Sequence, residues 1–365
     1  MNADRFRRRL DAMVHATGTA DVDAVVLAPS PDLAYLCGYD PMPFERPTLL
    51  VVRPDRDPTM LVPRLEVPLA EASPASDVAR IVGWSDGDDP YARAAALLEG
   101  STRVAIGDRT WALHVLGLQR AVPASFSSAS PIVGALRAVK DADELDALRR
   151  AGAAADRTFA DIVTRSFAGR RETEVAADLA ALLVDHGHDR ADFTIVASGP
   201  NAASPHHEPG ERTIGAGDVV VMDFGGSLDG YFSDTTRTVV VGEPTAEQAR
   251  VHDAVRRAQA AGTSAVRPGV AIQEVDRAAR AVLVDAGLGD AFIHRTGHGI
   301  GMEVHEPPYA VEGDATELRP GMTFSVEPGA YLAGAFGVRI EDIVAVTDDG
   351  VEPLNDSPRD LTVVA

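Results

Sequence analysis

Four acidic residues lie within apolar segments of this sequence, where water cannot solvate a charge. Asp223 follows Val-Val-Val-Met, and Asp234 precedes Thr-Thr-Arg-Thr-Val-Val-Val. Glu327 ends Met-Thr-Phe-Ser-Val, and Glu341 lies in Val-Arg-Ile-Glu-Asp-Ile-Val. An unpaired charge in such a place costs several kcal/mol or shifts its pKa until the group is neutral. If each pair of acids flanks one hairpin, the four carboxylates converge.

Converging carboxylates need positive charge beside them, because their repulsion is severe even at an effective dielectric constant of about 20. Arg237 and Arg339 are close to the acids in the sequence, so an ion-pair network is one interpretation. Bound divalent metal is the other.

Histidines near the acids favour metal. The stretch Thr-Gly-His-Gly-Ile-Gly-Met-Glu-Val-His-Glu contains His298 and His305, and Pro205 is followed by His206 and His207. Carboxylate oxygens together with imidazole suit hard or borderline metals. Two ions about 3.5–4 Å apart can hold a hydroxide and polarise a carbonyl. The residue types therefore predict a hydrolytic metal site.

The ordered motifs resemble those of the pita-bread metallopeptidases, in the branch of prolidases and aminopeptidase P enzymes. Two aspartates eleven residues apart are followed by Thr-Gly-His-Gly-Ile-Gly, then Val-Glu-Pro-Gly, then Arg-Ile-Glu-Asp. The resemblance extends from about Val139 to the C-terminus. It implies a dinuclear site in which Asp234 and Glu341 bridge the ions and Glu327 also shuttles the proton. The implied ligands are Asp223, Asp234, His298, Glu327 and Glu341.

The resemblance also implies roles for polar residues beside the ligands. His206 matches the histidine that steadies the carbonyl oxygen or the tetrahedral intermediate. His305 matches a second histidine that contacts substrate, and Arg339 would orient Glu341. His207 has no implied role.

Three features match the family less closely. Tyr231 and Arg237 fit family positions, but packing or ion pairing is the favoured role of each. The segment Glu306–Leu318 contains four acids and no Lys or Arg. It therefore lacks a cation for the C-terminal carboxylate of a dipeptide, which favours longer peptides. The alternative is that this loop faces solvent.

The first third of the chain predicts an α/β domain, residues 1–130, because short apolar runs alternate with helical stretches. The segment Ser30–Tyr39 resembles the creatinase/prolidase N-terminal domain. Helices are expected in the Arg-rich opening segment and over Leu113–Val122, and Pro123–Pro131 is the predicted linker. The expected strands are Val25–Leu27, Thr48–Val52, Met60–Val62 and Val104–Ile106.

Residues 139–365 predict an α+β domain with the pita-bread fold. Two helix pairs, each near a β-hairpin, suggest an internal duplication. The predicted helices run from a cap at Asp141 to about Ile162, from a cap at Thr173 to Gly187, from a capping box at Thr245 to about Ala261, and within Gly269–Gly287. The predicted strands are Val219–Phe224, Thr236–Val241, Met322–Val326 and Val338–Val346.

Composition excludes several classes of protein. The 365 residues include 34 Lys and Arg against 55 Asp and Glu, a net charge of −21, which argues against nucleic acid or an anionic membrane as partner. The single cysteine, Cys37, excludes an internal disulfide and a multi-cysteine zinc site. No signal core and no apolar window of about 18 residues is present, so we expect a soluble cytoplasmic protein.

The resemblance implies a homodimeric exopeptidase that cleaves the Xaa-Pro bond at the N-terminus of short peptides or dipeptides, through a metal-bridging hydroxide. Mn²⁺ is the expected metal, with Co²⁺ and Zn²⁺ as alternatives. Hydrolysis of a small non-peptide amide, as by creatinase or ectoine hydrolase, is a second hypothesis. A non-catalytic binding protein is a third, and it predicts disrupted ligands. The motifs are the same for dipeptidase and aminopeptidase activity.

Overall fold

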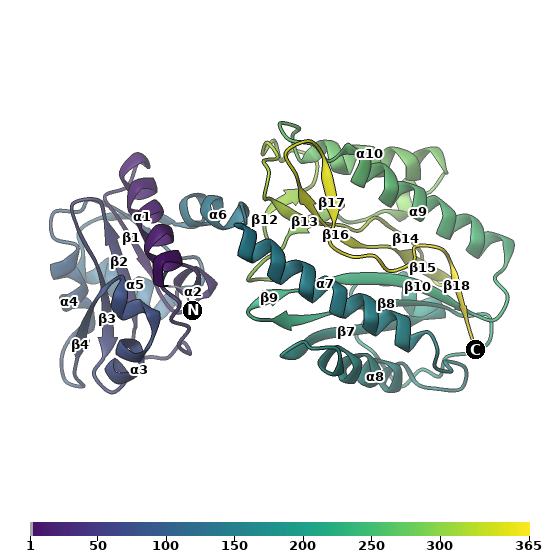
Figure 1. Cartoon of the computed structure of the whole chain (residues 1–365), viewed down its shortest axis with the longest axis horizontal. Helices are drawn as coiled ribbons and strands as arrows, with labels where there is room; N and C mark the ends of the chain where they lie inside the picture. The colour runs from purple at the N-terminus through teal and green to yellow at the C-terminus, as the bar shows by residue number, and fades with distance from the viewer. Residues whose placement is uncertain (1–2) are drawn as a thin grey trace. The chain divides into compact units, whose positions relative to one another are not determined.

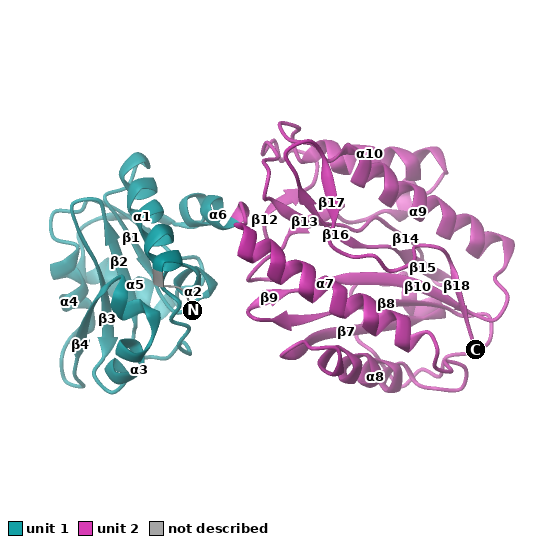
Figure 2. Ribbon diagram, viewed as in Figure 1, with its two compact units in different colours: residues 1–137 teal, residues 138–365 magenta. Residues whose placement is uncertain are grey.

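The computed structural model describes residues 3–365, which fall into two compact units (Figure 2). The first unit ends at Arg137 and the second begins at Ala138. Residues 131–137, which the predicted boundaries left outside both domains, thus belong to the first unit. No helix of the described residues is both long enough and apolar enough to cross a bilayer.

The first unit is built on a mixed sheet in the order β4-β3-β2-β1-β5-β6, with β1 buried along its whole length. Its strands are β1 Ala24–Leu27, β2 Leu49–Arg53, β3 Arg56–Pro63, β4 Arg80–Trp84, β5 Arg103–Ile106 and β6 Ser125–Ser128. Its helices are α1 Ala3–Thr19, α2 Pro31–Cys37, α3 Val67–Ala72, α4 Pro90–Leu97, α5 Ala112–Ala121 and α6 Ser130–Ala138, with the 3₁₀ turn η1 Pro74–Asp77. The predicted α/β character is confirmed.

The predicted linker Pro123–Pro131 is wrong. Ser125–Ser128 forms β6, which pairs in parallel with β5 at the edge of the sheet. An edge strand with exposed serine side chains carries no apolar run, so its sequence resembles a loop. Cys37 is buried, as predicted.

In the second unit, each helix pair packs against its own strands (Figure 1). The pair α7 Ala142–Ile162 and α8 Glu172–Asp185 covers a sheet of β7 Arg190–Ser198, β8 Val219–Leu228, β9 Tyr231–Phe232, β10 Thr235–Val241 and β18 Thr362–Val364. The pair α9 Ala246–Ala265 and α10 Gln273–Asp285 packs on the hairpin β14 Gly329–Leu332 and β15 Phe336–Arg339.

The remaining sheet of this unit has the order β12-β11-β13-β16-β17. Its strands are β11 Gly297–Gly299, β12 Glu306–Ala310, β13 Thr323–Val326, β16 Asp342–Val346 and β17 Val351–Pro353. The 3₁₀ turns are η2 Gly199–Ala203 and η3 Gly289–Ala291.

Two predicted element boundaries are wrong. Helix α8 is capped at Arg171 and not at Thr173, because the Glu174 side chain accepts from the backbone N–H of Arg171 there. The strand predicted over Val338–Val346 is broken at Ile340–Glu341, since β15 pairs with β14 whereas β16 pairs with β13. The chain thus changes partner strands at Glu341.

Candidate metal centre

Antiparallel strand pairs bring the four buried acids together. Asp223 lies on β8 opposite Thr236 of β10, and Asp234 directly precedes β10. Glu327 follows β13, and Glu341 precedes β16, with Val326 paired to Asp342. His298 lies on β11, which pairs with β13.

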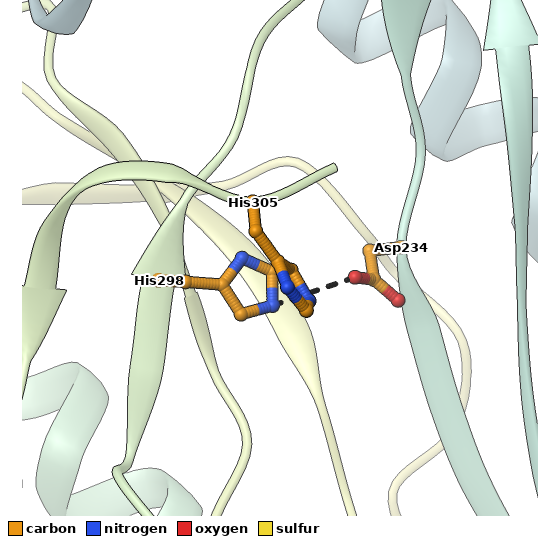
Figure 3. A group of neighbouring side chains, drawn as sticks. All are labelled: Asp234, His298 and His305. Atoms are coloured by element: carbon orange, nitrogen blue, oxygen red, sulfur yellow. Dashed lines mark ion pairs between the residues drawn. The ribbon is translucent and has the colours of Figure 1, made fainter. Parts of the chain in front are cut away.

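These side chains line a single cavity of about 750 Å³. Their donor atoms form three overlapping groups, and within each group the atoms lie within 4.8 Å of one another. The groups are Asp223, Asp234 and Glu341; His298, Glu327 and Glu341; and Asp234, His298 and His305. The third group shows that His305 is an additional candidate ligand (Figure 3).

The Nε2 atom of the His298 imidazole faces carboxylates. Its Nδ1 lies 3.2 Å from the carbonyl oxygen of Gly299, which can only accept, so a neutral ring with a cation bound at Nε2 would donate its one N–H from Nδ1. Its Nε2 lies 3.3 Å from Glu327 Oε1 and 3.6 Å from Asp234 Oδ2. Burial and the neighbouring His305 lower the pKa of His298 to about 3, which keeps it neutral. A lone pair facing two carboxylates is favourable when a cation lies between them.

The carboxylates give the same indication. Burial, reinforced by repulsion from neighbouring acids, raises the pKa of Asp234 and Glu341 well above their ordinary values, and burial raises that of Glu327 to about 7. Asp223 Oδ1 and Glu341 Oε1 are buried with no hydrogen-bond partner among residues 3–365. Buried oxygens without donors are rare in folded proteins. The donor set therefore fits divalent metal ions.

Arg339 organises the site from behind. Its Nη2 donates to Asp223 Oδ2, and its Nε donates to Thr236 Oγ1 at 3.2 Å. The Thr236 hydroxyl in turn donates to Glu341 Oε2 at 2.7 Å. Arg339 thus orients Asp223 directly and Glu341 through Thr236.

Arg237 and Tyr231 do not reach the cavity. The Arg237 guanidinium is paired with Asp342 at 2.6 Å, so it does not neutralise the four acids. Tyr231 is buried and donates to Glu144 at 2.8 Å. Packing and ion pairing are therefore their roles, as the sequence favoured.

Histidines other than His298 also line the cavity. The rings of His305 and His298 lie 3.9 Å apart, centre to centre (Figure 3). His206 is also part of the lining, whereas His207 lies 2.9 Å from Glu172 and is not. The structure therefore separates the two adjacent histidines.

Several cavity residues were missed in the sequence. His294 Nε2 accepts from the hydroxyl of Tyr331 at 2.9 Å, and that hydroxyl accepts from Arg339 at 2.8 Å. Burial lowers the pKa of His294 to about 4, so the ring is neutral. His294 lies four residues before the predicted ligand His298, so a search for histidines close to that ligand in the sequence would have found it. The apolar lining residues had no motif; they are Phe193, Ile195 and Val304.

The preference for longer peptides was predicted because Glu306–Leu318 has no cation to offer the substrate. That reasoning assumed that the acids of this segment face the substrate, which is wrong. Within the described residues, no acid of this segment lines the cavity. Glu306 is buried against Lys140 at 2.7 Å, and Glu312 pairs with Arg277 on the surface. Arg295, which precedes the segment, is a cationic residue of the cavity lining, as is Arg339, which pairs with Asp223.

Comparison with known proteins gives matches over the whole chain. The sequence pattern of "Metallopeptidase family M24" matches residues 146–348, and that of "Creatinase/Prolidase N-terminal domain" matches residues 9–139. The chain is 45% identical to "Probable dipeptidase PepE" of Mycobacterium tuberculosis, over 100% of this chain and 98% of the relative. It is 36% identical to "Xaa-Pro dipeptidase" of Lactobacillus delbrueckii subsp. lactis, over 94% and 95%. The crystal structure of dipeptidase PepE from Mycobacterium ulcerans superposes with a TM-score of 0.96 at 45% identity, covering 100% of this chain and 99% of that one.

Proposed function

Because the chain belongs to metallopeptidase family M24, we propose that it is an Xaa-Pro dipeptidase, which hydrolyses the bond between a first residue and a C-terminal proline. Membership confirms the predicted resemblance and the predicted fold, a creatinase/prolidase-type first domain with a pita-bread second domain. The chain is therefore a metal-dependent enzyme. Intact donors at all positions of the predicted ligand set argue against a non-catalytic binding protein, which predicts disrupted ligands.

One observation carries the proposal: the metal-binding donors share their cavity with Arg295 and an apolar wall. A dipeptide ending in proline has a carboxylate and an apolar ring close to the scissile bond. Arg295 can bind the carboxylate, and Ile195 with Val304 can cover the ring. The relatives named dipeptidase agree with this substrate length.

The proposed ligands of two ions are Asp223, Asp234, His298, Glu327 and Glu341. Ions bound there supply a water of lowered pKa and polarise the scissile carbonyl. Oxygen-rich ligation favours Mn²⁺, with Co²⁺ and Zn²⁺ as alternatives. We also propose that the enzyme is a homodimer, which light scattering of the purified protein would test.

Cavity side chains perform the remaining steps. A carboxylate oxygen of Glu327 takes the proton of the attacking water and delivers it to the departing proline nitrogen. His206 and His305 donate N–H groups to the carbonyl oxygen as negative charge develops on it. Arg339 keeps Asp223 and Glu341 in place through the contacts described above.

A substrate series tests the proposal. Metal-stripped protein is reloaded with Mn²⁺ and given Ala-Pro, Ala-Pro amide, Ala-Pro-Ala and Ala-Ala, and release of the first residue is measured. Ala-Pro is expected to have the highest kcat/KM. Absence of proline-dependent release would refute the function.

Arg295→Ala tests the carboxylate contact. A charge-assisted hydrogen bond contributes about 1.5–3 kcal/mol, so KM for Ala-Pro is expected to rise about 10- to 100-fold. KM for the amide, which lacks the carboxylate, stays unchanged. Arg277→Ala, which removes a surface arginine of the same unit, is the control. An equal effect of Arg295→Ala on both substrates would contradict the assignment.

A further inference from the structure

The segment between β7 and β8 forms part of the cavity wall without belonging to a sheet. After the turn η2 it contributes Pro205, His206 and Glu208 to the lining. A side chain on such a segment keeps a defined position only when its backbone is held from several directions. The contacts of this segment identify what holds it.

Glu172, the first residue of α8, lies beneath this segment and is fully buried. Its carboxylate accepts hydrogen bonds from the last residue of β7 and from successive parts of the segment. The donors are Ser198 N at 2.8 Å, Ser198 Oγ at 2.7 Å, Asn201 Nδ2 at 3.0 Å, His207 Nε2 at 2.9 Å and Gly210 N at 3.1 Å. A carboxylate has about four lone-pair sites, so these donors saturate it.

The contact with His207 constrains the chain beside the cavity. An ionised carboxylate can only accept, so His207 Nε2 carries the proton and donates it to Glu172 Oε2. Burial alone would raise the pKa of Glu172, but hydrogen bonds from Ser198, His207 and Asn201 outweigh it and lower the pKa, which keeps the carboxylate ionised.

The other side of the segment is held by the metal centre itself. Arg339 Nη1 donates to the carbonyl oxygen of Pro205 at 3.3 Å. Residue 206 thus lies between a neighbour held by Arg339 and a neighbour held by Glu172. Both anchors act on residues adjacent to His206, which itself lines the cavity.

The ends of the segment are tied to one another. Arg212 pairs with Asp218 at 2.6 Å and also donates to Ser198 Oγ at 2.6 Å. Gly199 has a φ of +49°, and a Cβ there would lie 2.6 Å from Asp218 Oδ1. The ends of the segment are therefore held by the Arg212–Asp218 pair as well as by Glu172, whereas beside His206 the contact with Glu172 is made by His207.

We propose that Glu172, acting through His207, is a positioning residue that fixes His206 against the reacting carbonyl. The inference rests on the proposed function, because His206 needs a substrate carbonyl to act on. It gives the second of the two adjacent histidines a role. Glu172 itself does not touch substrate.

Glu172→Gln is the first test, because glutamine keeps the shape but turns an N–H group toward the donors. We expect kcat for Ala-Pro to fall about 10- to 100-fold with KM and bound Mn²⁺ unchanged. Glu174→Gln is the matched control: it removes the same charge from the same helix turn, its side chain is exposed, and the glutamine carbonyl can still accept from Arg171 N. It is expected to keep the kcat of the unmodified enzyme.

Variants of His207 separate a lost contact from a lost fold. His207→Gln keeps an N–H donor and is expected to retain most of kcat, whereas His207→Leu, which removes one of the five hydrogen bonds to Glu172, is expected to lower kcat in the same direction as Glu172→Gln. Combining Glu172→Gln with His206→Ala should cost no more than His206→Ala alone, because the effect passes through His206. An equal cost of Glu172→Gln in both backgrounds would overturn the proposal.

A measurement without turnover keeps this inference distinct from the proposed function. The histidine ring signals of the metal-free protein are recorded by NMR, and that of His206 is identified by its loss in His206→Ala. It is expected to shift or broaden in Glu172→Gln and to stay unchanged in Glu174→Gln. An unchanged His206 signal in Glu172→Gln would overturn the positioning role, even if the dipeptidase assay succeeds. A shifted signal with no turnover on any proline substrate would refute the proposed function alone.

Discussion

Two adjacent acids, Glu341 and Asp342, lie in opposite electrostatic environments. Both are buried. Asp342 accepts from Arg237 at 2.6 Å and from Gln259 at 2.9 Å, and it also pairs with Arg359. Glu341 accepts from Thr236 through one oxygen, and its other oxygen has no donor among the described residues.

The difference shows that partners, and not burial, decide what a buried carboxylate does. Asp342 is surrounded by cationic and amide donors and stabilises the fold. Burial and the charges of Glu327 and Asp223 raise the pKa of Glu341 well above its ordinary value, so the nearby Arg339 does not compensate for the buried negative charge. A buried carboxylate whose pKa is raised in this way is typical of a functional site. Glu172 belongs with Asp342, because its donors saturate it.

The largest expected effect comes from Glu341→Gln. Removing a ligand of the proposed ions forfeits several kcal/mol of transition-state stabilisation, so kcat/KM is expected to fall at least about 100-fold. Metal content by mass spectrometry should fall as well. The Tm of the metal-free protein should rise, because a buried charge without a partner has been removed. Unchanged metal content in Glu341→Gln would contradict the assignment of Glu341 to metal binding and of Asp342 to stabilising the fold.

Asp342→Asn should give the reverse pattern. Breaking a buried ion pair from one side costs about 3–5 kcal/mol of unfolding free energy, because Arg237 is left without its counter-charge. Urea unfolding measures this loss. Metal content of the folded variant should stay at the level of the unmodified protein. Asp348→Asn, which changes an exposed acid just beyond β16, is the control and should stay within about 0.5 kcal/mol. Loss of metal in Asp342→Asn would contradict the division of roles.

The smallest expected effect is a pH dependence that metal removes. Burial raises the pKa of Glu327 from 4.5 to about 7 in the metal-free fold, so the folded state binds the proton more tightly than the unfolded state. Stability is therefore greatest below the unfolded pKa and falls as pH rises toward about 7. We expect the Tm of chelator-treated protein to fall by about 5 °C or more between about pH 5 and about pH 7.5.

Saturating Mn²⁺ should abolish most of that fall, because metal binds the deprotonated carboxylates and favours them as pH rises. Differential scanning calorimetry with and without metal measures the difference. If Tm fell equally with pH in the presence and absence of Mn²⁺, the pH dependence would come from groups other than the acids of the cavity.

Local sequence signals predicted more of the site than of its surroundings. An acid within an apolar strand is visible without the fold, which is why Asp223 and Asp234 could be singled out. Arg295 and Tyr331 carried no such signal, because polar residues near glycines are common in loops. The break in the predicted strand at Ile340–Glu341 was also missed, since an apolar run does not show where a strand changes partners.

The sequence by itself determined the residue types of the metal centre, their order and the apolar strands that force those acids inward. Only the tertiary structure decided which acid received which partner. Arg237 and Arg339 each lie within three residues of one of the acids in the sequence, yet one pairs with Asp342 and the other with Asp223. Likewise, His206 faces the cavity while His207 binds Glu172, 35 positions earlier. Such choices depend on distances across strands and helices, which spacing along the chain does not encode.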